Sequence, residues 1–165
     1  LERDIAELDQ LIDEILLSSR LDALTALEHV EDVDLLALAA EEAARFEHAA
    51  ASGTPVVIKG DARLLRRLIR NLIENAERHG APPIEIEVEP AAKGANLRVL
   101  DHGPGVAAAD RERVFEPFFR TSVAGETRPG AGLGLALVRQ IARRHGGNVR
   151  AISDVGGRSG FVVSL

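Results

Sequence analysis

Two asparagines four residues apart, Asn71 and Asn75, are the first side chains whose spacing indicates chemistry. Residues four apart share one face of a helix, so the two amides point the same way. A carboxamide oxygen is a hard, neutral ligand that suits Mg²⁺, which keeps water and phosphate oxygens as its other ligands. Asn75 is therefore a candidate metal ligand, although this pair alone fits two solvated surface asparagines equally well.

A second cluster, Asp101-His102-Gly103-Pro104-Gly105, comes directly after a predicted strand. A carboxylate at a strand end stands on a rigid base, and glycines allow another molecule to approach the backbone closely. Such an aspartate is suited to accept a hydrogen bond from an exocyclic amine, as in adenine. Asp and Gly are also the commonest turn residues, so taken alone this segment is better explained as a turn.

A third cluster gathers three of the five phenylalanines: Phe115, Phe118 and Phe119. The simplest interpretation is a small hydrophobic cluster beside the loop that follows. Residues 121–130 show no apolar periodicity and contain Gly125, so we expect a mobile loop there. Aromatic side chains at its base would anchor a lid.

The fourth cluster is glycine-rich, with Gly130, Gly132 and Gly134 at alternate positions before a predicted helix. Backbone N–H groups at a helix start can bind phosphate, and glycine lets the phosphate come close. The string is not a Walker motif, because no Gly-Lys-Ser/Thr follows. Leu137 stands where the last glycine of a dinucleotide fingerprint would fall, so that motif is excluded too.

The elements that must position these clusters follow from periodicity. Apolar residues spaced 4-3-4-3 predict one helix over residues 1–27, with these residues in a stripe along one face. Such a stripe needs a partner helix, and a bundle or coiled-coil helix fits it better than a helix packed on its own domain. That stripe consists of Leu1, Ile5, Leu8, Ile12 and Ile15.

Further helices are predicted over 33–51, 61–79 and 133–145, with a short one over 110–115. Strands are predicted over 56–58, 84–88, 97–101, 149–152 and 161–165. Because helices and strands interleave and several strands are adjacent along the chain, the predicted fold class is an α/β (α+β) two-layer sandwich with a mixed sheet.

Composition removes several classes of function. The chain has 165 residues and a net charge of −6, and this acidic balance argues against nucleic acid as a partner. It has no Cys, which excludes disulfides and thiolate metal sites. No apolar run approaches the roughly 20 residues that cross a bilayer. The chain begins at Leu1 and contains no Met, so we expect a piece of a longer protein whose N-terminal part carries any membrane anchor.

Taken together and in order, the four clusters resemble the N box, first glycine box, F box and second glycine box of the catalytic domain of bacterial sensor histidine kinases. The resemblance covers residues 33–165 and implies the Bergerat ATP-binding fold. Residues 1–27 are similar to the second helix of that family's dimerisation bundle, which leaves 28–32 as a linker. The implied function is transfer of the ATP γ-phosphate to a His, for relay to an Asp of a response regulator.

The resemblance also implies which residues contact ATP. They are Asn71, Asn75, Arg78, His79, Asp101, Gly103, Gly105, Phe115, Phe118, Arg120, Gly130, Gly132, Leu133 and Gly134. Within this set, Asn75 would ligate Mg²⁺, Asp101 would bind the adenine amino group, and Arg120 would belong with residues 121–129 to an ATP lid. His79 stands where the family often has an aromatic residue by the nucleotide, which is a departure from the pattern.

The phosphoacceptor is a larger departure. The family's acceptor His is followed by an acidic residue, whereas the chain's five His are followed by Val, Ala or Gly. The acceptor is therefore expected on a bundle helix outside this chain, and no catalytic residue is assigned within it. The resemblance further implies a homodimer in the parent protein, a response-regulator receiver domain as partner, and a position on the cytoplasmic side of the inner membrane.

Two other functions stay open. ATPases that resemble this fold place a water-activating Glu four residues before the metal-binding Asn, where this chain has Asn71, an amide that cannot act as a base. Phosphoryl transfer is therefore favoured over ATP hydrolysis. A nucleotide-binding interaction module, either a degenerate kinase or a relative of the anti-sigma-factor kinases, is the other alternative; the helix over 1–27 and the intact motifs argue against it.

Overall fold

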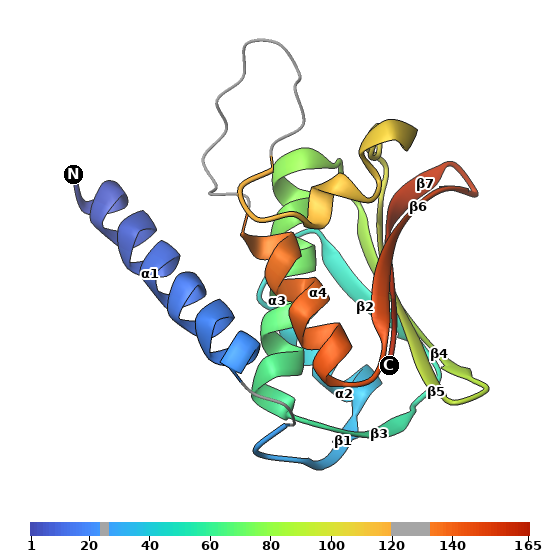
Figure 1. The fold of residues 1–165 in the computed structure, drawn as a ribbon. Coiled ribbons are helices and arrows are strands. Elements are labelled where there is room, and N and C mark those ends of the chain that lie inside the picture. The colour runs from blue at the N-terminus through green and yellow to red at the C-terminus, as the bar shows by residue number, and fades with distance from the viewer. Residues whose placement is uncertain (24–26, 120–132) are drawn as a thin grey trace.

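The computed structural model describes residues 1–23, 27–119 and 133–165. In this part of the chain a five-stranded mixed sheet carries three helices on one face, while α1 extends away from them (Figure 1). The predicted two-layer α/β sandwich is confirmed. Among the described residues, no helix combines the length and the apolar character needed to cross a membrane.

The helices are α1 (Glu2–Ala23), α2 (Leu35–Ala43), α3 (Ala62–His79) and α4 (Gly134–Arg144), with 3-10 turns at Ala108–Asp110 and Arg113–Phe115. The strands are β1 (Glu31–Asp34), β2 (Ala49–Gly53), β3 (Val57–Gly60), β4 (Ile84–Ala91), β5 (Gly94–Asp101), β6 (Asn148–Val155) and β7 (Arg158–Ser164). The main sheet has the order β2-β4-β5-β7-β6, in which β2 and β4 are parallel and the other neighbours antiparallel. A separate antiparallel pair joins β1 and β3.

Helix α3 lies where its capping and periodicity predict. The Asp61 carboxylate accepts hydrogen bonds from the backbone N–H groups of Arg63 (3.0 Å) and Leu64 (3.3 Å), as an N-cap should. One face is buried throughout, and the helix ends before Gly80. The buried residues recur every three or four positions: Leu65, Leu68, Ile69, Leu72, Ile73 and Ala76.

The beginning of α3 is also tied to the end of α4 by His145. The backbone N–H of Asp61 donates to His145 Nε2 at 3.0 Å, and His145 Nδ1 lies 2.8 Å from the Ile141 carbonyl oxygen. Since Nε2 accepts, Nδ1 must carry the proton, and the ring is neutral. Burial lowers the pKa of His145, which favours the same neutral form.

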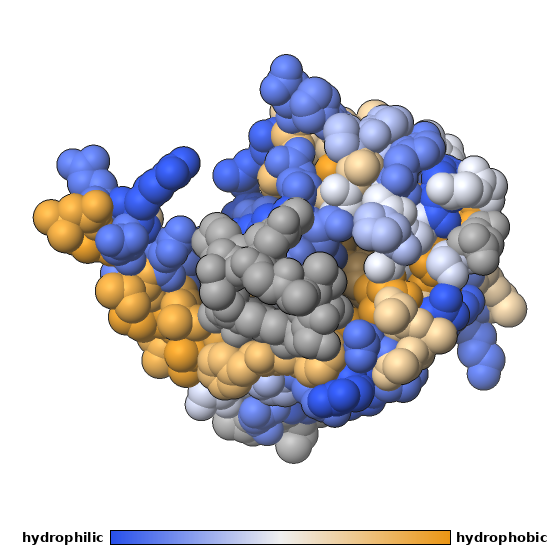
Figure 2. Space-filling model, turned by 90° about the horizontal axis from the view of Figure 1, so that it is seen from above, coloured by the Kyte–Doolittle hydropathy of each residue, from blue (hydrophilic) through white to orange (hydrophobic). Residues whose placement is uncertain are grey.

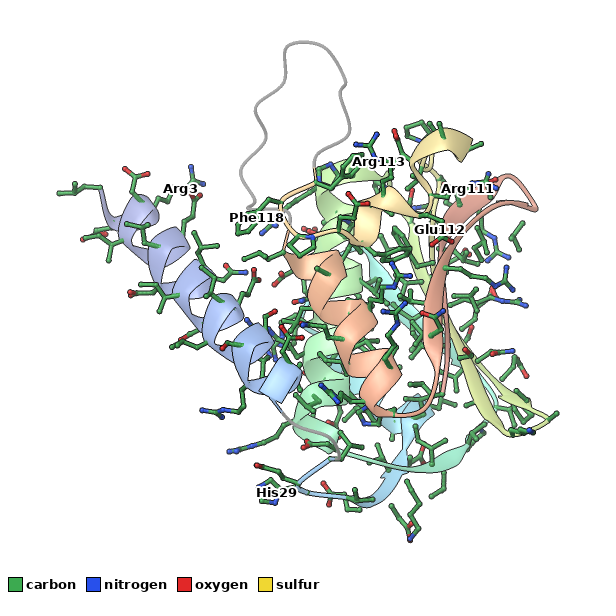
Figure 3. All side chains as sticks on the ribbon, in the orientation of Figure 1. Arg3, His29, Arg111, Glu112, Arg113 and Phe118 are labelled. Carbon is green, nitrogen blue, oxygen red and sulfur yellow. The ribbon has the colours of Figure 1, made fainter. Side chains whose placement is uncertain are left out.

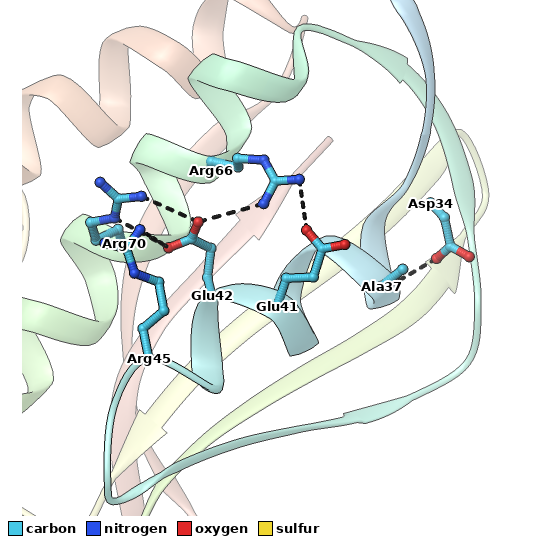
Figure 4. A network of polar contacts seen from close by, with 7 residues as sticks. All are labelled: Asp34, Ala37, Glu41, Glu42, Arg45, Arg66 and Arg70. Atoms are coloured by element: carbon cyan, nitrogen blue, oxygen red, sulfur yellow. Dashed lines mark hydrogen bonds and ion pairs between the residues drawn. The ribbon is translucent and has the colours of Figure 1, made fainter.

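A buried ion-pair cluster fixes α2 against the first half of α3 (Figure 4). The Glu42 side chain is only 2% exposed and receives Arg70 Nε at 3.2 Å and Arg70 Nη2 at 3.3 Å. Arg66 lies 3.7 Å from Glu42 and 2.6 Å from Glu41. Because a buried carboxylate without partners is costly, these contacts hold α2 and α3 in one relative position.

The second predicted helix is too long. The Ala- and Leu-rich pattern predicted a helix over 33–51, but the helix spans only Leu35–Ala43 and is flanked by β1 and β2. Asp34 caps α2, accepting a hydrogen bond from the Ala37 N–H at 3.0 Å. Residues 49–53 instead pair with 84–88 of β4, so parallel sheet pairing overrides the helix propensity of alanine. Residues 31 and 32, predicted as linker, lie in β1.

Helix α1 contacts the rest of the molecule through a face other than its predicted stripe. Leu21 is 2% exposed, and Gln140 Nε2 of α4 donates to Asp22 Oδ1 at 2.8 Å. Glu14 is also buried and lies 3.9 Å from Arg67, and burial raises the pKa of the Glu14 carboxyl. The predicted stripe remains in solvent, visible as the apolar side of α1 in Figure 2.

Candidate functional site

The second half of α3 carries four of the predicted ATP-contacting residues. Asn71 is 5% exposed, and its Nδ2 donates to the Gly134 carbonyl oxygen at 3.3 Å. Asn75 is half-buried one turn later, while Arg78 and His79 are exposed at the helix end. The structure therefore brings Asn71 together with the first residue of α4, and Asn75 follows one turn later on α3.

Asp101 ends β5 next to the end of α3. It is 7% exposed, and its Oδ1 accepts hydrogen bonds from the N–H groups of Gly103 (2.7 Å) and Ala81 (3.4 Å). Both of these hydrogen bonds use Oδ1. Within the described part of the chain Oδ2 has no such partner, so it is the oxygen that can accept from a ligand. A carboxylate with one oxygen held by backbone N–H groups is already oriented before a ligand binds.

Close approach of the backbone explains two glycines beside Asp101. A Cβ on Gly80 would lie 2.3 Å from Asp101 Cγ, and one on Gly103 would lie 2.6 Å from Gly80 Cα. Neither distance is possible without movement of the chain. The ends of α3 and β5 therefore meet at a point where only glycine fits, and the role of Gly103 in shaping a base pocket stays a prediction.

Ser159 is a site residue that the sequence did not reveal. It lies on β7 directly opposite Asp101, is 5% exposed, and donates from Oγ to the Gly103 carbonyl oxygen at 3.3 Å. A Cβ on Gly105, whose φ is +73°, would come within 2.9 Å of Ser159 Cβ. A serine in a C-terminal strand carries no sequence signal for this role, because the β5–β7 pairing that places it is long-range.

The predicted aromatic residues separate into two environments. Phe115 is 3% exposed and packs edge-to-face on Phe161 of β7, with ring centroids 5.8 Å apart, so its ring belongs to the core. Phe118 is 62% exposed, has a φ of 63°, and lies on the side of the molecule that faces α1 (Figure 3). Arg113 stacks over Phe119 at 4.8 Å. The expected hydrophobic cluster exists, but Phe118 is not part of it.

The predicted glycine-rich motif is described only at its end. Leu133 is buried and Gly134 is the first residue of α4, with Asn71 Nδ2 at 3.9 Å the nearest atom to a Cβ built on it. Arg120, Gly130 and Gly132 lie outside the described residues, as do residues 121–129, predicted as a lid. The phosphate-binding role predicted for those residues stays a prediction.

A cavity of about 460 Å³ separates α1 from α3 and is bordered by Asn71 and Glu74. On the other side it is bordered by Asp9, Gln10 and Asp13 of α1. Within the described residues, no group of three or more His, Asp or Glu side chains could hold a metal ion.

The comparisons with known proteins agree with this geometry. The family model described as "Histidine kinase-, DNA gyrase B-, and HSP90-like ATPase" matches residues 60–165, which include Asn71, Asp101 and Gly134. The chain belongs to this ATPase family. Within it, the chain is an ATP-binding domain of the sensor histidine kinase type.

Named relatives place it more narrowly. The chain is 33% identical to the sensor-like histidine kinase SenX3 of Mycolicibacterium smegmatis over 99% of its own length and 47% of that protein. It is 35% identical to the sensor protein RstB of Escherichia coli over 95% of its length and 39% of RstB. The ATP-binding domain of PrrB from Mycobacterium tuberculosis has 29% identity and a TM-score of 0.68, with 84% of this chain and 97% of that one covered. The chain spans less than half the length of SenX3 and RstB.

Proposed function

We propose that this chain is the catalytic part of a sensor histidine kinase that transfers the γ-phosphoryl group of ATP to a histidine on a bundle helix outside residues 1–165. The observation that carries the proposal is the set of polar side chains on the second half of α3 and at the end of β5. There a buried, oriented aspartate meets the end of the helix that carries Asn71 and Asn75, and Asn71 bonds to the start of α4. That arrangement suits a nucleotide whose base lies by Asp101 and whose phosphates lie along α3 towards α4.

The base end of the site is assigned to Asp101 and its supports. With Oδ1 held by Gly103 N–H, Oδ2 accepts from the adenine amino group. Gly105 and Ser159 hold the loop after Asp101 in shape, since Ser159 Oγ donates to the Gly103 carbonyl oxygen. A guanine presents a carbonyl oxygen in place of that amine, so two acceptors would face one another there.

The phosphate end is assigned to α3 and the start of α4. The Asn75 carboxamide oxygen is a suitable Mg²⁺ ligand, because it is neutral, half-buried and next to the phosphate side of the site. Bound Mg²⁺ neutralises charge on the phosphate oxygens. Exposed Arg78 and His79 lie at the same end of α3, and Gly134 leaves space at the helix start. The sequence assigns Arg120, Gly130, Gly132 and Leu133 to the same end.

In the transfer, a nitrogen of the acceptor histidine attacks the γ-phosphorus. The bond between that phosphorus and the bridging oxygen breaks, ADP leaves with the electron pair, and the attacking ring gives up its proton to solvent. Catalysis is mainly positioning and charge neutralisation. Asn71 supports transfer over hydrolysis, because its amide donates to Gly134 and cannot remove a proton from water.

The rest of the parent protein follows from the same proposal. Helix α1 belongs to the second helix of a dimerisation bundle and precedes the catalytic domain along the chain. The exposed side chains of Ile5, Leu8 and Ile12 are then covered by the other helices of a homodimer. The phosphohistidine passes its phosphoryl group to an Asp of a response-regulator receiver domain on the cytoplasmic side of the membrane, to which the preceding part of the protein is anchored.

The test uses ATP labelled in the γ-phosphate, with Mg²⁺, this chain and a separate two-helix bundle of the parent protein. We expect acid-labile label on the bundle and none on the chain alone. Transfer should be slow, by several orders of magnitude, because the acceptor is untethered. Asn75→Ala should abolish the label, whereas Lys93→Gln, an exposed turn residue, should not change it. Steady phosphate release without the bundle would indicate an ATPase, and ATP binding without any label would indicate a binding module.

A further inference from the structure

A second cavity borders the N-terminal half of α3, whereas the proposed adenine site lies at the C-terminal end of that helix. It has a volume of about 400 Å³ and is bordered by the C-terminal part of α1, residues 27–29, the first half of α3 and the end of α4. Volumes of this size are typical of small-molecule sites. Arg63 in this groove and Asn75 are 12 residues apart on α3, which corresponds to about 18 Å along the helix. The Arg63 end of the groove therefore lies well away from Asn75, while Arg67 and Arg70 border both this groove and the cavity beside Asn71.

We call this cavity the hinge groove, because it lies where α1 meets α3 and α4. Arginine dominates its lining. Six arginines from three helices border it: Arg20, Arg63, Arg66, Arg67, Arg70 and Arg144. The chain as a whole is acidic, with a net charge of −6, so this concentration of guanidinium groups runs against its overall charge. Guanidinium groups bind carboxylates, phosphates and sulfonates through paired hydrogen bonds.

Three of these arginines already have carboxylate partners. Arg66 and Arg70 pair with Glu42, and Arg67 pairs with Glu14. Within the described residues, Arg20, Arg63 and Arg144 form no ion pair with a carboxylate; Arg144 donates to the Leu21 carbonyl oxygen.

The carboxylates that border the groove do not balance these three charges. Asp61 and Glu28 border it, so two carboxylate charges stand against the three guanidinium charges. The groove therefore has an excess of positive charge.

The remaining surface of the hinge groove is apolar. Leu17, Leu27 and Leu64 are half-buried and border it together with the buried Leu21. An inorganic ion would leave this surface in water, whereas a molecule with an apolar body would cover it. The lining is therefore complementary to a ligand that is anionic at one end and apolar at the other.

We propose that the hinge groove binds a small organic anion, a carboxylate, phosphate or sulfonate attached to an apolar body. Its anionic group lies between Arg20 of α1, Arg63 of α3 and Arg144 of α4, and its apolar body rests on the leucines. Because the ligand contacts three helices, it holds α1 against the catalytic domain. If the proposed kinase function is correct, the ligand controls how freely that domain moves relative to the bundle.

The probe for the binding claim is 8-anilinonaphthalene-1-sulfonate, a sulfonate on an aromatic body whose fluorescence rises on binding. It is titrated into the full chain in excess Mg·ATP, so that the nucleotide site is occupied. The test variant is Arg20→Gln/Arg63→Gln. The control is Arg3→Gln/Arg143→Gln, which removes the same charge from exposed positions on α1 and α4 outside the groove.

We expect the test variant to bind the probe about tenfold more weakly, as for loss of charge-assisted contacts, and the control to bind it like the wild type. Amide NMR shifts on probe addition should fall at residues 17–21, 27–29 and 61–67. Equal affinity in all three proteins, equal weakening in both variants, or shifts confined to the exposed stripe of α1 would overturn the proposal. Binding of inorganic phosphate as tightly as the probe would contradict the apolar half of it. These outcomes are independent of phosphoryl transfer, so they leave the kinase proposal untouched.

Discussion

At its N-terminal end, α3 is held by contacts within the protein. Asp61 caps the helix, and His145 accepts a hydrogen bond from the Asp61 N–H. The Glu42 carboxylate accepts a hydrogen bond from Arg70 of α3. At its C-terminal end the polar groups are only partly used. Asn75 is half-buried, and Asp101 is held through one oxygen. Both ends have buried polar groups with well-defined partners, so burial alone does not distinguish a structural site from a binding site. The two ends differ in the groups that remain for a ligand: Asp101 at the C-terminal end keeps a carboxylate oxygen, whereas the groove at the N-terminal end offers guanidinium groups.

The largest effect is expected from Gly80→Ala. The new Cβ would lie 2.3 Å from Asp101 Cγ and 2.7 Å from the Ala76 carbonyl oxygen, so the aspartate must move. Overpacking of this kind costs about 1–3 kcal/mol, and we expect ATP affinity to fall by about 100-fold. Calorimetric titration measures the affinity, and thermal unfolding measures the stability.

Gly156→Ala is the control for this prediction. It strains a left-handed residue, φ +63°, in the β6–β7 turn but meets no atom within 4 Å. It should lower the stability by about 1–2 kcal/mol and leave ATP affinity unchanged. Equal ATP affinity for Gly80→Ala and wild type would show that Asp101 is not held as described.

Asp101→Asn should weaken ATP binding by about 1–3 kcal/mol, or roughly 10- to 100-fold, and reduce the preference for ATP over GTP. The variant keeps an oxygen for the Gly103 N–H but replaces the acceptor proposed for adenine with a donor. Competition of ATP and GTP against a fluorescent nucleotide gives both numbers. If wild type and variant discriminate equally, Asp101 does not bind the base.

Glu42→Gln at the N-terminal end should lower the stability of the fold but leave ATP binding unchanged. It leaves Arg66 and Arg70 without their buried partner, so the free energy of unfolding should fall by about 1.5–3 kcal/mol. ATP affinity should stay within twofold of wild type, because the variant changes no group at the nucleotide end. Urea unfolding and calorimetry test the two halves separately, and a large loss of affinity would break the distinction between the ends.

The smallest effect is a pH dependence from His145. Burial lowers its pKa in the folded protein, so the unfolded chain binds a proton at higher pH than the folded one. The neutral ring therefore contributes fully above about pH 6.5, and its contribution declines as the pH falls through the lowered folded value. The stability difference between wild type and His145→Gln, from urea unfolding at pH 7.5 and 5.5 (~2 pH units apart), should shrink at the lower pH. A stability difference that stays constant or grows at the lower pH would contradict a neutral His145 ring that makes two hydrogen bonds.

The sequence predicts those parts of the fold that depend on local signals. Asp61 as cap, Gly80 as end of α3, and the alternation of Ile84, Ile86 and Val88 all have the predicted structural role. The strand at 49–53 was missed because alanines favour helix, and only the parallel pairing with β4 makes them a strand.

In the candidate site too, local signals are visible in the sequence and long-range contacts are not. Asn71 and Asp101 stand out by residue type and spacing, whereas Ser159 and the contact of Gly80 with Asp101 depend on long-range pairing. The stripe of α1 was correctly recognised as apolar. The face that α1 uses within the chain, with Glu14 and Leu21, has no such pattern, since a buried carboxylate interrupts it.

The central claim is that the C-terminal end of α3 receives the nucleotide and the N-terminal end does not, and amide NMR of the full chain tests this most directly. On addition of ATP and Mg²⁺, the largest shifts are expected at residues 71–81, 101–105 and 159, with residues 61–67 almost unchanged. Removing Mg²⁺ with a chelator should reverse the shifts around Asn75 more than those around Asp101. Shifts concentrated at residues 61–67, or no response at Asp101 and Gly103, would contradict the account.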